Sequence, residues 1–339
     1  MDSRSRMLAV LDRKIPDRVP TFEFLIDSQV INALSPGADL YDFVEKMGLD
    51  AVAVRPDMRR EQISKDVFRT ETGSIVQRTT QDYLEVTNTV IDSEEDLRKF
   101  EFPDPYADHR LSSLKRAVER FKPKGIAVVA FLRDGWSESR DLHGFAQSLI
   151  DLIDNPQLIR GIIEKAVDYY SELGRLAAQA GVEIASSGDD IAGINGMLMS
   201  PEHFHQIIYP AMKRLYRNWH SYGLRIIKHS DGDLNPVLDL LVDTGLDCLN
   251  PIDPLAGMSL EKVKKQYGDR ICLMGNVNCA GNLVFGTQDQ VKAEVKHCID
   301  VAAPGGGYIL ASSNSIPRSV KPENYLSMLE AVRQYGGYN

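Results

Sequence analysis

The sequence predicts an α/β protein, a single (β/α)8 TIM barrel with a small β-hairpin insertion after its second strand. The chain has 339 residues, which is enough for one large α/β barrel. Short apolar runs rich in β-branched residues alternate with longer segments of helical period as far as the C-terminus. Eight of these runs have the character of strands, and a closed barrel of this class needs eight.

The expected elements follow one another in a regular order. Residues 67–90 are rich in Thr, Val and alternating polar residues around Thr72-Gly73, which indicates the hairpin insertion. Helices are expected after Asn155-Pro156 and Ser200-Pro201, where an N-cap precedes proline, and after Thr287, which begins a capping box. The expected strands are residues 19–24, 51–55, 125–132, 184–187, 225–228, 248–251, 271–274 and 308–311.

Composition excludes several classes of function. The 39 basic and 48 acidic residues give a net charge of −9, so no nucleic-acid-binding surface is implied. The N-terminus lacks the apolar core of a signal peptide, and no apolar run reaches the ~20 residues of a membrane helix. We therefore expect a cytoplasmic protein without a membrane partner. The four cysteines have no CxxC spacing and are expected to be free thiols.

Polar side chains gather where the strands of the predicted barrel end. Barrel enzymes place their chemistry at the carboxyl ends of the strands. Loop-capping Asp and Asn explain some of these residues, but random turns would not supply polar groups after all eight strands. The candidate site residues are Glu23, Asp57, Arg133, Asp190, His229, Asp231, Asp253, Asn276 and Asn314.

The most specific pair is His229 and Asp231. Residues two apart on a strand point to the same face, so the imidazole and the carboxylate should converge at the barrel mouth. The pair suits a metal ion or proton transfer. The alternative is that Asp231-Gly232 is a turn and His229 a hydrogen-bonded wall residue. Asp190 also follows a strand, and its alternative role is to cap the next helix.

Two other carboxylates have structural alternatives as well. Asp57 lies between Pro56 and a helix-like segment, so it could be an ordinary N-cap. Glu23 lies in an otherwise apolar strand and would be costly to bury unpaired. We expect Glu23 to have either a role in the site or a partner such as Arg133.

Motifs along the chain resemble those of the uroporphyrinogen decarboxylase superfamily. They run in order from the first strand to the last residues. The matching motifs are residues 17–20 (DRVP), 48–51 (GLDA), 229–232 (HSDG), 245–247 (GLD), 274–277 (MGNV), 305–310 (GGGYIL), 322–324 (PEN) and 335–338 (YGGY). The resemblance implies one (β/α)8 barrel domain over residues 1–339, and the superfamily includes both decarboxylases and corrinoid-dependent methyltransferases.

The resemblance also shows where this sequence departs from each branch. Decarboxylases have two arginines after strand one, an aspartate after strand two and a histidine after strand eight; only the aspartate is matched, by Asp57, and Asn314 replaces the histidine. The zinc methyltransferases have His-x-Cys after strand five and cysteine after strand eight; here His229 is kept, with Asp231 and Asn314 at the cysteine positions. An acidic mouth would in addition repel a polycarboxylate tetrapyrrole.

The expected function is therefore corrinoid-dependent methyl transfer from a small, O-methylated donor to a corrinoid protein. His229, Asp231 and Asp190 would hold a divalent metal, with zinc as the expected ion. Glu23, Asp57 and Asn276 would be catalytic, and Arg133, Asp253 and Asn314 would bind substrate. The corrinoid would belong to the partner, and a homodimer is compatible with the sequence. The alternative is a decarboxylase of the uroporphyrinogen decarboxylase type that acts on a smaller, less anionic substrate.

Overall fold

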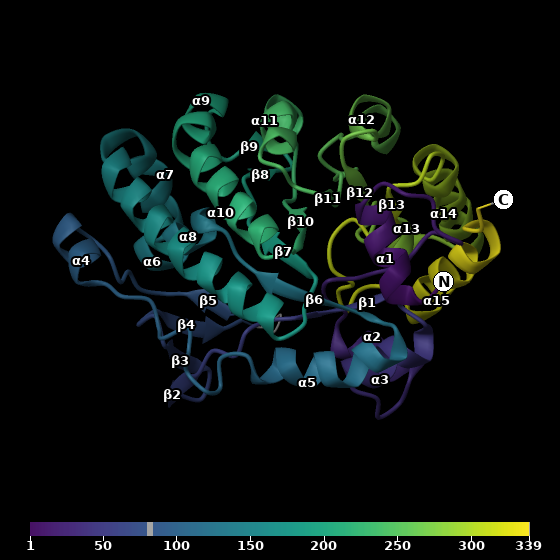
Figure 1. Ribbon diagram of the computed structural model, residues 1–339, viewed down its shortest axis with the longest axis horizontal. Coiled ribbons are helices and arrows are strands. Elements are labelled where there is room, and N and C mark those ends of the chain that lie inside the picture. Colours follow the sequence, from purple (N-terminus) through teal and green to yellow (C-terminus); the bar gives the residue numbers. More distant parts are fainter. Residues whose placement is uncertain (80–83, 339) are drawn as a thin grey trace.

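The computed structural model describes residues 1–79 and 84–338, and within them a curved parallel sheet organises the fold (Figure 1). The order of its strands follows the chain, with each strand paired to the next. The strands of this sheet are β1 (Ala51–Val54), β6 (Ala127–Leu132), β7 (Ile184–Gly188), β10 (Arg225–His229), β11 (Cys248–Asn250), β12 (Cys272–Met274) and β13 (Tyr308–Ile309). Each lies within a few residues of an expected strand.

The first expected strand, residues 19–24, is not a regular strand. Its backbone nevertheless links the two edges of the sheet: Leu310 N donates to Pro20 O (2.9 Å), and Asp50 N donates to Thr21 O (2.9 Å). Pro20 has no N–H to give to a ladder, which leaves too few consecutive bonds for a strand. An irregular segment thus lies between β13 and β1, where the predicted barrel needs one more strand.

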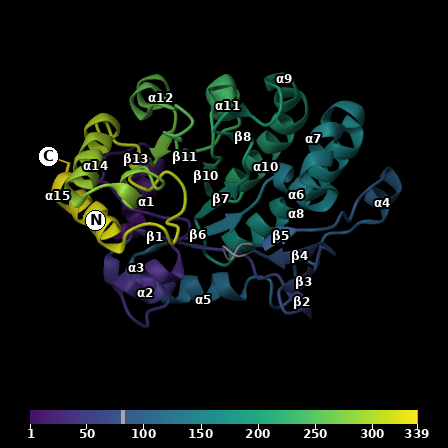
Figure 2. The ribbon, with the colours of Figure 1, turned by 180° about the vertical axis from the view of Figure 1, so that it is seen from behind.

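Helices lie around the outside of the strands, and Figures 1 and 2 show this from opposite sides. Asn155, Ser200 and Thr287 cap helices as expected, and Thr287 forms the capping box with Gln290. The α-helices are α1 (Ser3–Leu11), α2 (Ser28–Leu34), α3 (Leu40–Met47), α4 (Glu94–Lys99), α5 (Ser112–Phe121), α6 (Gly135–His143), α7 (Phe145–Asp154), α8 (Pro156–Gln179), α9 (Pro201–His203), α10 (Tyr209–Ser221), α11 (Leu238–Asp243), α12 (Leu260–Tyr267), α13 (Asn282–Phe285), α14 (Gln288–Ala302) and α15 (Pro322–Tyr335). Short 3₁₀ turns η1 (Lys122–Lys124) and η3 (Asn235–Val237) and a π-helical turn η2 (Phe204–Ile208) complete the set.

The segment after β1 forms an antiparallel sheet instead of one small hairpin. The strands, in chain order, are β2 (Arg60–Ser64), β3 (Val67–Thr70), β4 (Ile75–Arg78) and β5 (Leu84–Val86). The insertion therefore begins earlier than the predicted 67–90, and residues 80–83 of that prediction lie outside the described residues. Both ribbon views place this sheet at one end of the molecule, away from α14 and α15 (Figures 1 and 2). A further short pair, β8 (Ala192–Gly193) and β9 (Gly196–Met197), follows β7.

The inner face of the parallel sheet has its own apolar cluster, separate from the larger one beneath the helices. The two-residue period of a strand places Ala51 and Ala53 of β1 and Val129 and Phe131 of β6 on the inner face. Alternate residues such as Val52 and Val54 pack outward instead. If this two-residue period continues beyond the ends of the strands, the side chains of residues 55 and 133 also point to the inner face.

A buried carboxylate joins the N-terminal segment to the sheet. Asp50 is fully buried and accepts hydrogen bonds from Arg6, from both terminal nitrogens of Arg18 and from the backbone N–H of Thr21. Arg6 also pairs with Asp17. Two of the motifs noted above, at residues 17–20 and 48–51, are therefore explained by packing and not by catalysis.

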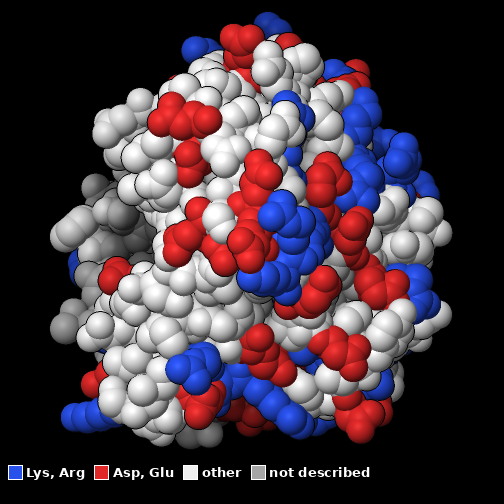
Figure 3. All heavy atoms as spheres, turned by 90° about the vertical axis from the view of Figure 1, so that its left-hand side faces the viewer, with Lys and Arg blue, Asp and Glu red and all other residues white. Residues whose placement is uncertain are grey.

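Other features of the fold agree with the composition. The four cysteines are buried and free. Among the described residues, no helix combines the length and apolar character that crossing a bilayer requires. Acidic and basic side chains are interspersed on the face that carries α4 and α7 in Figure 1, so this face has no field of a single sign (Figure 3).

Candidate metal centre and cleft

A cleft of about 1490 Å³ opens at the carboxyl ends of the parallel strands. Phe24, Gly188, Asp190 and His229 line one side of it. Residues of α6 and α8 and of the inserted antiparallel sheet line the other sides. The insertion is therefore a wall of the cleft and not a distant appendage.

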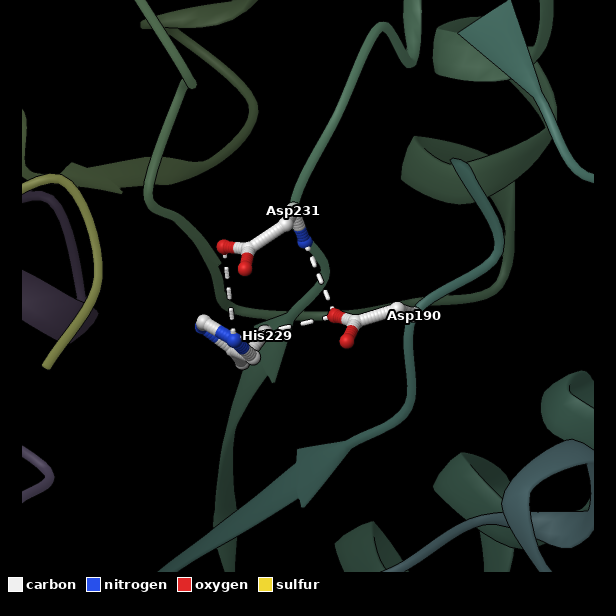
Figure 4. Close-up of side chains that lie close together, drawn as sticks. All are labelled: Asp190, His229 and Asp231. Carbon is white, nitrogen blue, oxygen red and sulfur yellow. Dashed lines mark hydrogen bonds and ion pairs between the residues drawn. The ribbon is translucent and has the colours of Figure 1, made fainter. Parts of the chain in front are cut away.

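Three predicted metal ligands meet in this region, from the ends of two neighbouring strands (Figure 4). His229 ends β10, Asp231 follows it by two residues, and Asp190 follows β7. His229 Nε2 lies 3.6 Å from Asp231 Oδ1 and 3.8 Å from Asp190 Oδ1. Two ligand atoms about 2.0–2.2 Å from a tetrahedral zinc ion are about 3.3–3.6 Å apart, so the three groups are spaced for a metal.

The tautomer of His229 is set by Asn250 at the end of β11. His229 Nδ1 and Asn250 Oδ1 are 2.6 Å apart, and Asn250 Nδ2 donates to the carbonyl of Met274 (3.2 Å). Because the amide oxygen only accepts, Nδ1 must carry the proton. Nε2 then presents its lone pair to the two carboxylates. Only a cation or a proton between them makes that arrangement favourable.

Asp231 supplies a second observation in favour of a cation. Its Oδ2 accepts from Asn314 Nδ2, but its Oδ1 is buried and has no hydrogen-bond partner among the described residues. Burial raises the pKa of Asp231 to about 6, and the charges of Asp190 and Asp253 add to the rise. A buried carboxylate oxygen without a partner is costly unless it ligates a metal. The set of one imidazole and two carboxylates fits zinc or another divalent ion.

The variant Asn250→Ala tests the support of the histidine. It should weaken binding of Zn²⁺ by about 10–100-fold, because the imidazole loses the acceptor that fixes its tautomer and orientation. The affinity is measured by competition with a chelating dye. Asn235→Ala, which changes an asparagine of the η3 turn, should bind Zn²⁺ as the unmodified protein does. An Asn250→Ala protein with unchanged affinity would contradict this role.

Glu23 is buried beside the last strand but does not pair with Arg133, contrary to one expectation. Ser312 N donates to Glu23 Oε1 (2.9 Å), while Ser312 Oγ lies 2.7 Å from both Glu23 Oε2 and the carbonyl of Asn314. One hydroxyl proton cannot serve both acceptors, so a protonated Glu23 completes the pattern. Burial raises the pKa of Glu23 to about 8.

This protonation makes stability depend on pH. Because the folded state keeps a proton that the unfolded chain releases above its ordinary pKa, the free energy of unfolding should fall as pH rises from about 4.5 to about 8. Glu23→Gln has no carboxyl proton to lose, so its free energy of unfolding should not show this fall. The substitution should therefore raise the melting temperature more at pH 8.5 than at pH 5. Thermal unfolding at the two pH values checks it, with the exposed Glu119→Gln as control. Equal shifts at both pH values would contradict the assignment.

Three other predicted residues are engaged in local structure. Asp57 accepts from Ser113 N (2.7 Å) and Ser113 Oγ (2.6 Å) at the start of α5, although it also borders the cleft. Asp253 accepts from Gly232 N (3.1 Å) and Leu255 N (2.9 Å). Asn276 Nδ2 donates to the carbonyl of Ile252 (2.7 Å) in a buried position. Among the described residues, none of these hydrogen bonds is made to the side chain of a metal ligand.

Several arginines line the cleft. Arg133 lines it and pairs with Glu138 (3.1 Å) and Asp141 (2.7 Å). Arg55 and Arg140 line it too. Arg55 follows the second expected strand, where the sequence predicts residues of the mouth, whereas Arg140 lies within α6 without a distinguishing pattern. The carboxylates of the cleft, which include Asp57, Glu138, Asp141 and Asp190, are therefore accompanied by arginines.

Comparisons with known proteins agree with the motifs. The family model described as uroporphyrinogen decarboxylase (URO-D) matches residues 42–335. A methylcobamide:CoM methyltransferase, MtaA, of Methanosarcina barkeri (strain Fusaro / DSM 804) is 29% identical over 178 residues, 51% of this chain and 49% of that protein. A uroporphyrinogen decarboxylase of Syntrophotalea carbinolica is 24% identical over 179 residues, 53% of this chain and 49% of that protein. The match thus spans about half the length of these curated relatives.

A solved structure resembles the whole chain. It is described as a methyltransferase from Methanosarcina mazei and superimposes with a TM-score of 0.80 over 99% of both chains, at 20% sequence identity. At this identity the likeness concerns the fold.

Proposed function

The chain belongs to the uroporphyrinogen decarboxylase family, and one of its relatives is a methyltransferase. We propose that this chain is a metal-assisted methyltransferase. It takes a methyl group from a small, O-methylated substrate and delivers it to a corrinoid carried by a separate protein. The observation that carries this proposal is the cluster of Asp190, His229 and Asp231 at the strand ends. Asp190 and His229 line the cleft, and Asp231 Oδ1 is buried without a hydrogen-bond partner among the described residues. The relative named as a methylcobamide:CoM methyltransferase supports methyl transfer that involves a cobamide.

The ligand set favours an oxygen-bound methyl group. The three clustered residues offer one nitrogen and carboxylate oxygens and no sulfur. When bound there, a divalent ion would supply Lewis-acid stabilisation of the negative charge that develops on the departing oxygen. A metal with oxygen ligands is a stronger Lewis acid than one with thiolates, which suits an ether better than a thioether. Asn250 and Asn314 keep His229 and Asp231 oriented for this task.

The size of the cleft supports a reaction between two partners. Small-molecule sites usually measure about 300–1,000 Å³, and the cleft of about 1490 Å³ exceeds that range. A small donor beside the metal ligands would leave room for a second reactant to approach within about 3–3.5 Å of the methyl carbon. We take residues 1–339 as one (β/α)8 barrel domain, in which the segment through Thr21 completes the ring of strands.

The experiment compares two reactions of the same metal-loaded protein. Aryl methyl ethers are supplied with Co(I) cobalamin, and methylcobalamin is followed by its absorbance; uroporphyrinogen is supplied separately and coproporphyrinogen is sought by chromatography. We expect methylcobalamin and no decarboxylation. Decarboxylation without any methyl transfer, even with a corrinoid protein encoded beside this chain, would favour the decarboxylase alternative.

A further inference from the structure

The floor of the cleft between the metal ligands and α6 is aromatic. The ring of Phe24 meets the imidazole of His229 edge to face, with centroids 5.8 Å apart, and Phe131 lies 5.3 Å from Phe24. The ring of Phe131 packs directly on Gly188 at the end of β7. A side chain at this position would clash with the ring, since a Cβ on Gly188 would lie 2.6 Å from Phe131 Cε2. Both rings belong to the inner face of the sheet and line the cleft. The two rings are tilted by 35° to each other and form an apolar patch beside the metal centre.

A guanidinium group without a counter-charge lies at the far end of this surface. Arg55 continues the inner face of β1, and its guanidinium carbon lies 4.3 Å from the centroid of the Phe131 ring. In the described part of the chain it has no hydrogen bond or ion pair, whereas Arg133 beside it has two carboxylate partners. Partial desolvation in the cleft, followed by the charge of Arg133, lowers the pKa of Arg55 to about 10, so the group is still a cation at neutral pH.

A second arginine of the same cleft has a similar environment. The guanidinium carbon of Arg140 lies 5.6 Å from the ring centroid of Phe145, and within the described residues it has no ion pair. Burial lowers the pKa of Arg140 as well. The side chain of Arg55 is open to solvent in the cleft, and that of Arg140 is half-buried. Both cations stack on rings and have no ion pair among the described residues, so both are available to an anionic ligand.

We infer that Arg55 binds the carboxylate of a flat aromatic acid whose ring packs beside Phe24 and Phe131 and whose methylated oxygen faces the metal ligands. Arg140 adds positive charge to the same cleft. The inference rests on the proposed function and narrows its substrate to methoxylated aromatic acids. It also places the acid-binding group after β1, which is the second expected strand of the barrel. The decarboxylase pattern places its two arginines after the first expected strand, residues 19–24.

The geometry favours a carboxylate over a bulkier anion. The guanidinium group of Arg55 is planar and pairs with a carboxylate through the N–H groups at its edge. The flat face of the guanidinium can therefore remain stacked on the ring of Phe131. A benzoate has the same flat shape from ring to carboxylate. Only the unpaired arginines can accept the charge, because Glu138 and Asp141 already neutralise Arg133.

The test measures binding and does not depend on methyl transfer. 4-Hydroxybenzoate and 4-hydroxybenzamide are titrated by calorimetry into the zinc-loaded unmodified protein, Arg55→Gln and Arg217→Gln, an exposed arginine of α10 that does not line the cleft. We expect the acid to bind at least about 10-fold more tightly than the amide, as the loss of a charge-assisted pair implies. Arg55→Gln should remove that preference and leave the affinity for the amide within about 2-fold. Arg217→Gln should change neither affinity.

Three results would overturn the inference. One is equal binding of acid and amide by the unmodified protein, or no binding of either. Another is an Arg55→Gln protein that keeps the preference or loses both ligands equally. The third is inorganic phosphate displacing 4-hydroxybenzoate at equal concentration, which would assign the arginines to a phosphate. None of these results bears on methylcobalamin formation, so failure of the substrate assignment and failure of methyl transfer can be told apart.

Discussion

Replacing His229 with alanine should abolish stable binding of a divalent metal. His229 Nε2 is the one ligand atom that lies within 4 Å of both carboxylates, at 3.6 and 3.8 Å, so its loss leaves two carboxylates that repel each other. We expect the affinity for Zn²⁺ to fall by at least about 100-fold, more than loss of a supporting residue costs. The methyl-transfer rate should fall to background. Metal content after gel filtration and equilibrium competition measure the change.

A matched histidine controls for nonspecific effects. His205 is exposed beside Tyr209, outside the cleft, so His205→Ala should retain metal and activity. The fold of His229→Ala should persist, because the residue lies at a strand end and contributes little to the apolar clusters. Stoichiometric zinc in a folded His229→Ala protein would contradict the assignment of ligands.

Replacing Lys228 with methionine should have the largest effect on stability. Lys228 Nζ is buried and donates to Asp134 Oδ2 (2.9 Å) and to the carbonyl of Asp189 (2.7 Å). Methionine keeps the length of the side chain but leaves Asp134 charged and buried without a cation. Breaking a buried pair in this way costs about 3–5 kcal/mol. Urea denaturation should show a loss of that size in the free energy of unfolding.

A second change distinguishes the lost charge from lost packing. Adding Asp134→Asn to Lys228→Met removes the stranded carboxylate and should restore part of the stability. The exposed Lys265→Met should change stability by less than about 0.5 kcal/mol. Because Lys228 and the carbonyl of Asp189 adjoin His229 and Asp190 in the chain, we also expect the single variant to bind zinc more weakly. A double variant no more stable than the single one would show that the charge is not the cause.

Much of the parallel sheet and of the helices around it could be predicted because their signals are local. Runs of β-branched residues and N-caps such as Asn155 and Thr287 act within a few residues of the chain, and these elements lie where the sequence places them. The convergence of His229 and Asp231 followed from the two-residue period of a strand. The neighbouring strand end that supplies Asp190 followed from the predicted parallel order of the strands, whose carboxyl ends lie on one face.

The remaining features depend on contacts between distant parts of the chain. The first strand is irregular because Pro20 lacks a donor, and its carbonyl finds Leu310 from the other end of the sequence. Asp57 caps α5 through Ser113, a partner that spacing does not reveal. Residues 189 and 190 are both aspartate, but Asp189 accepts from Ser137 N in the interior while Asp190 lines the cleft. Arg140 was missed because nothing in a helical pattern marks one polar residue as facing a cleft.

X-ray absorption spectroscopy of the zinc-loaded protein tests whether Asp190, His229 and Asp231 hold a divalent metal at the strand ends. We predict one zinc ion per chain with a shell of nitrogen and oxygen at about 2.0–2.2 Å, the multiple-scattering signature of one imidazole, and no sulfur at about 2.3 Å. A sulfur shell, a zinc site with no imidazole, or a protein that binds no stoichiometric divalent metal would contradict this prediction.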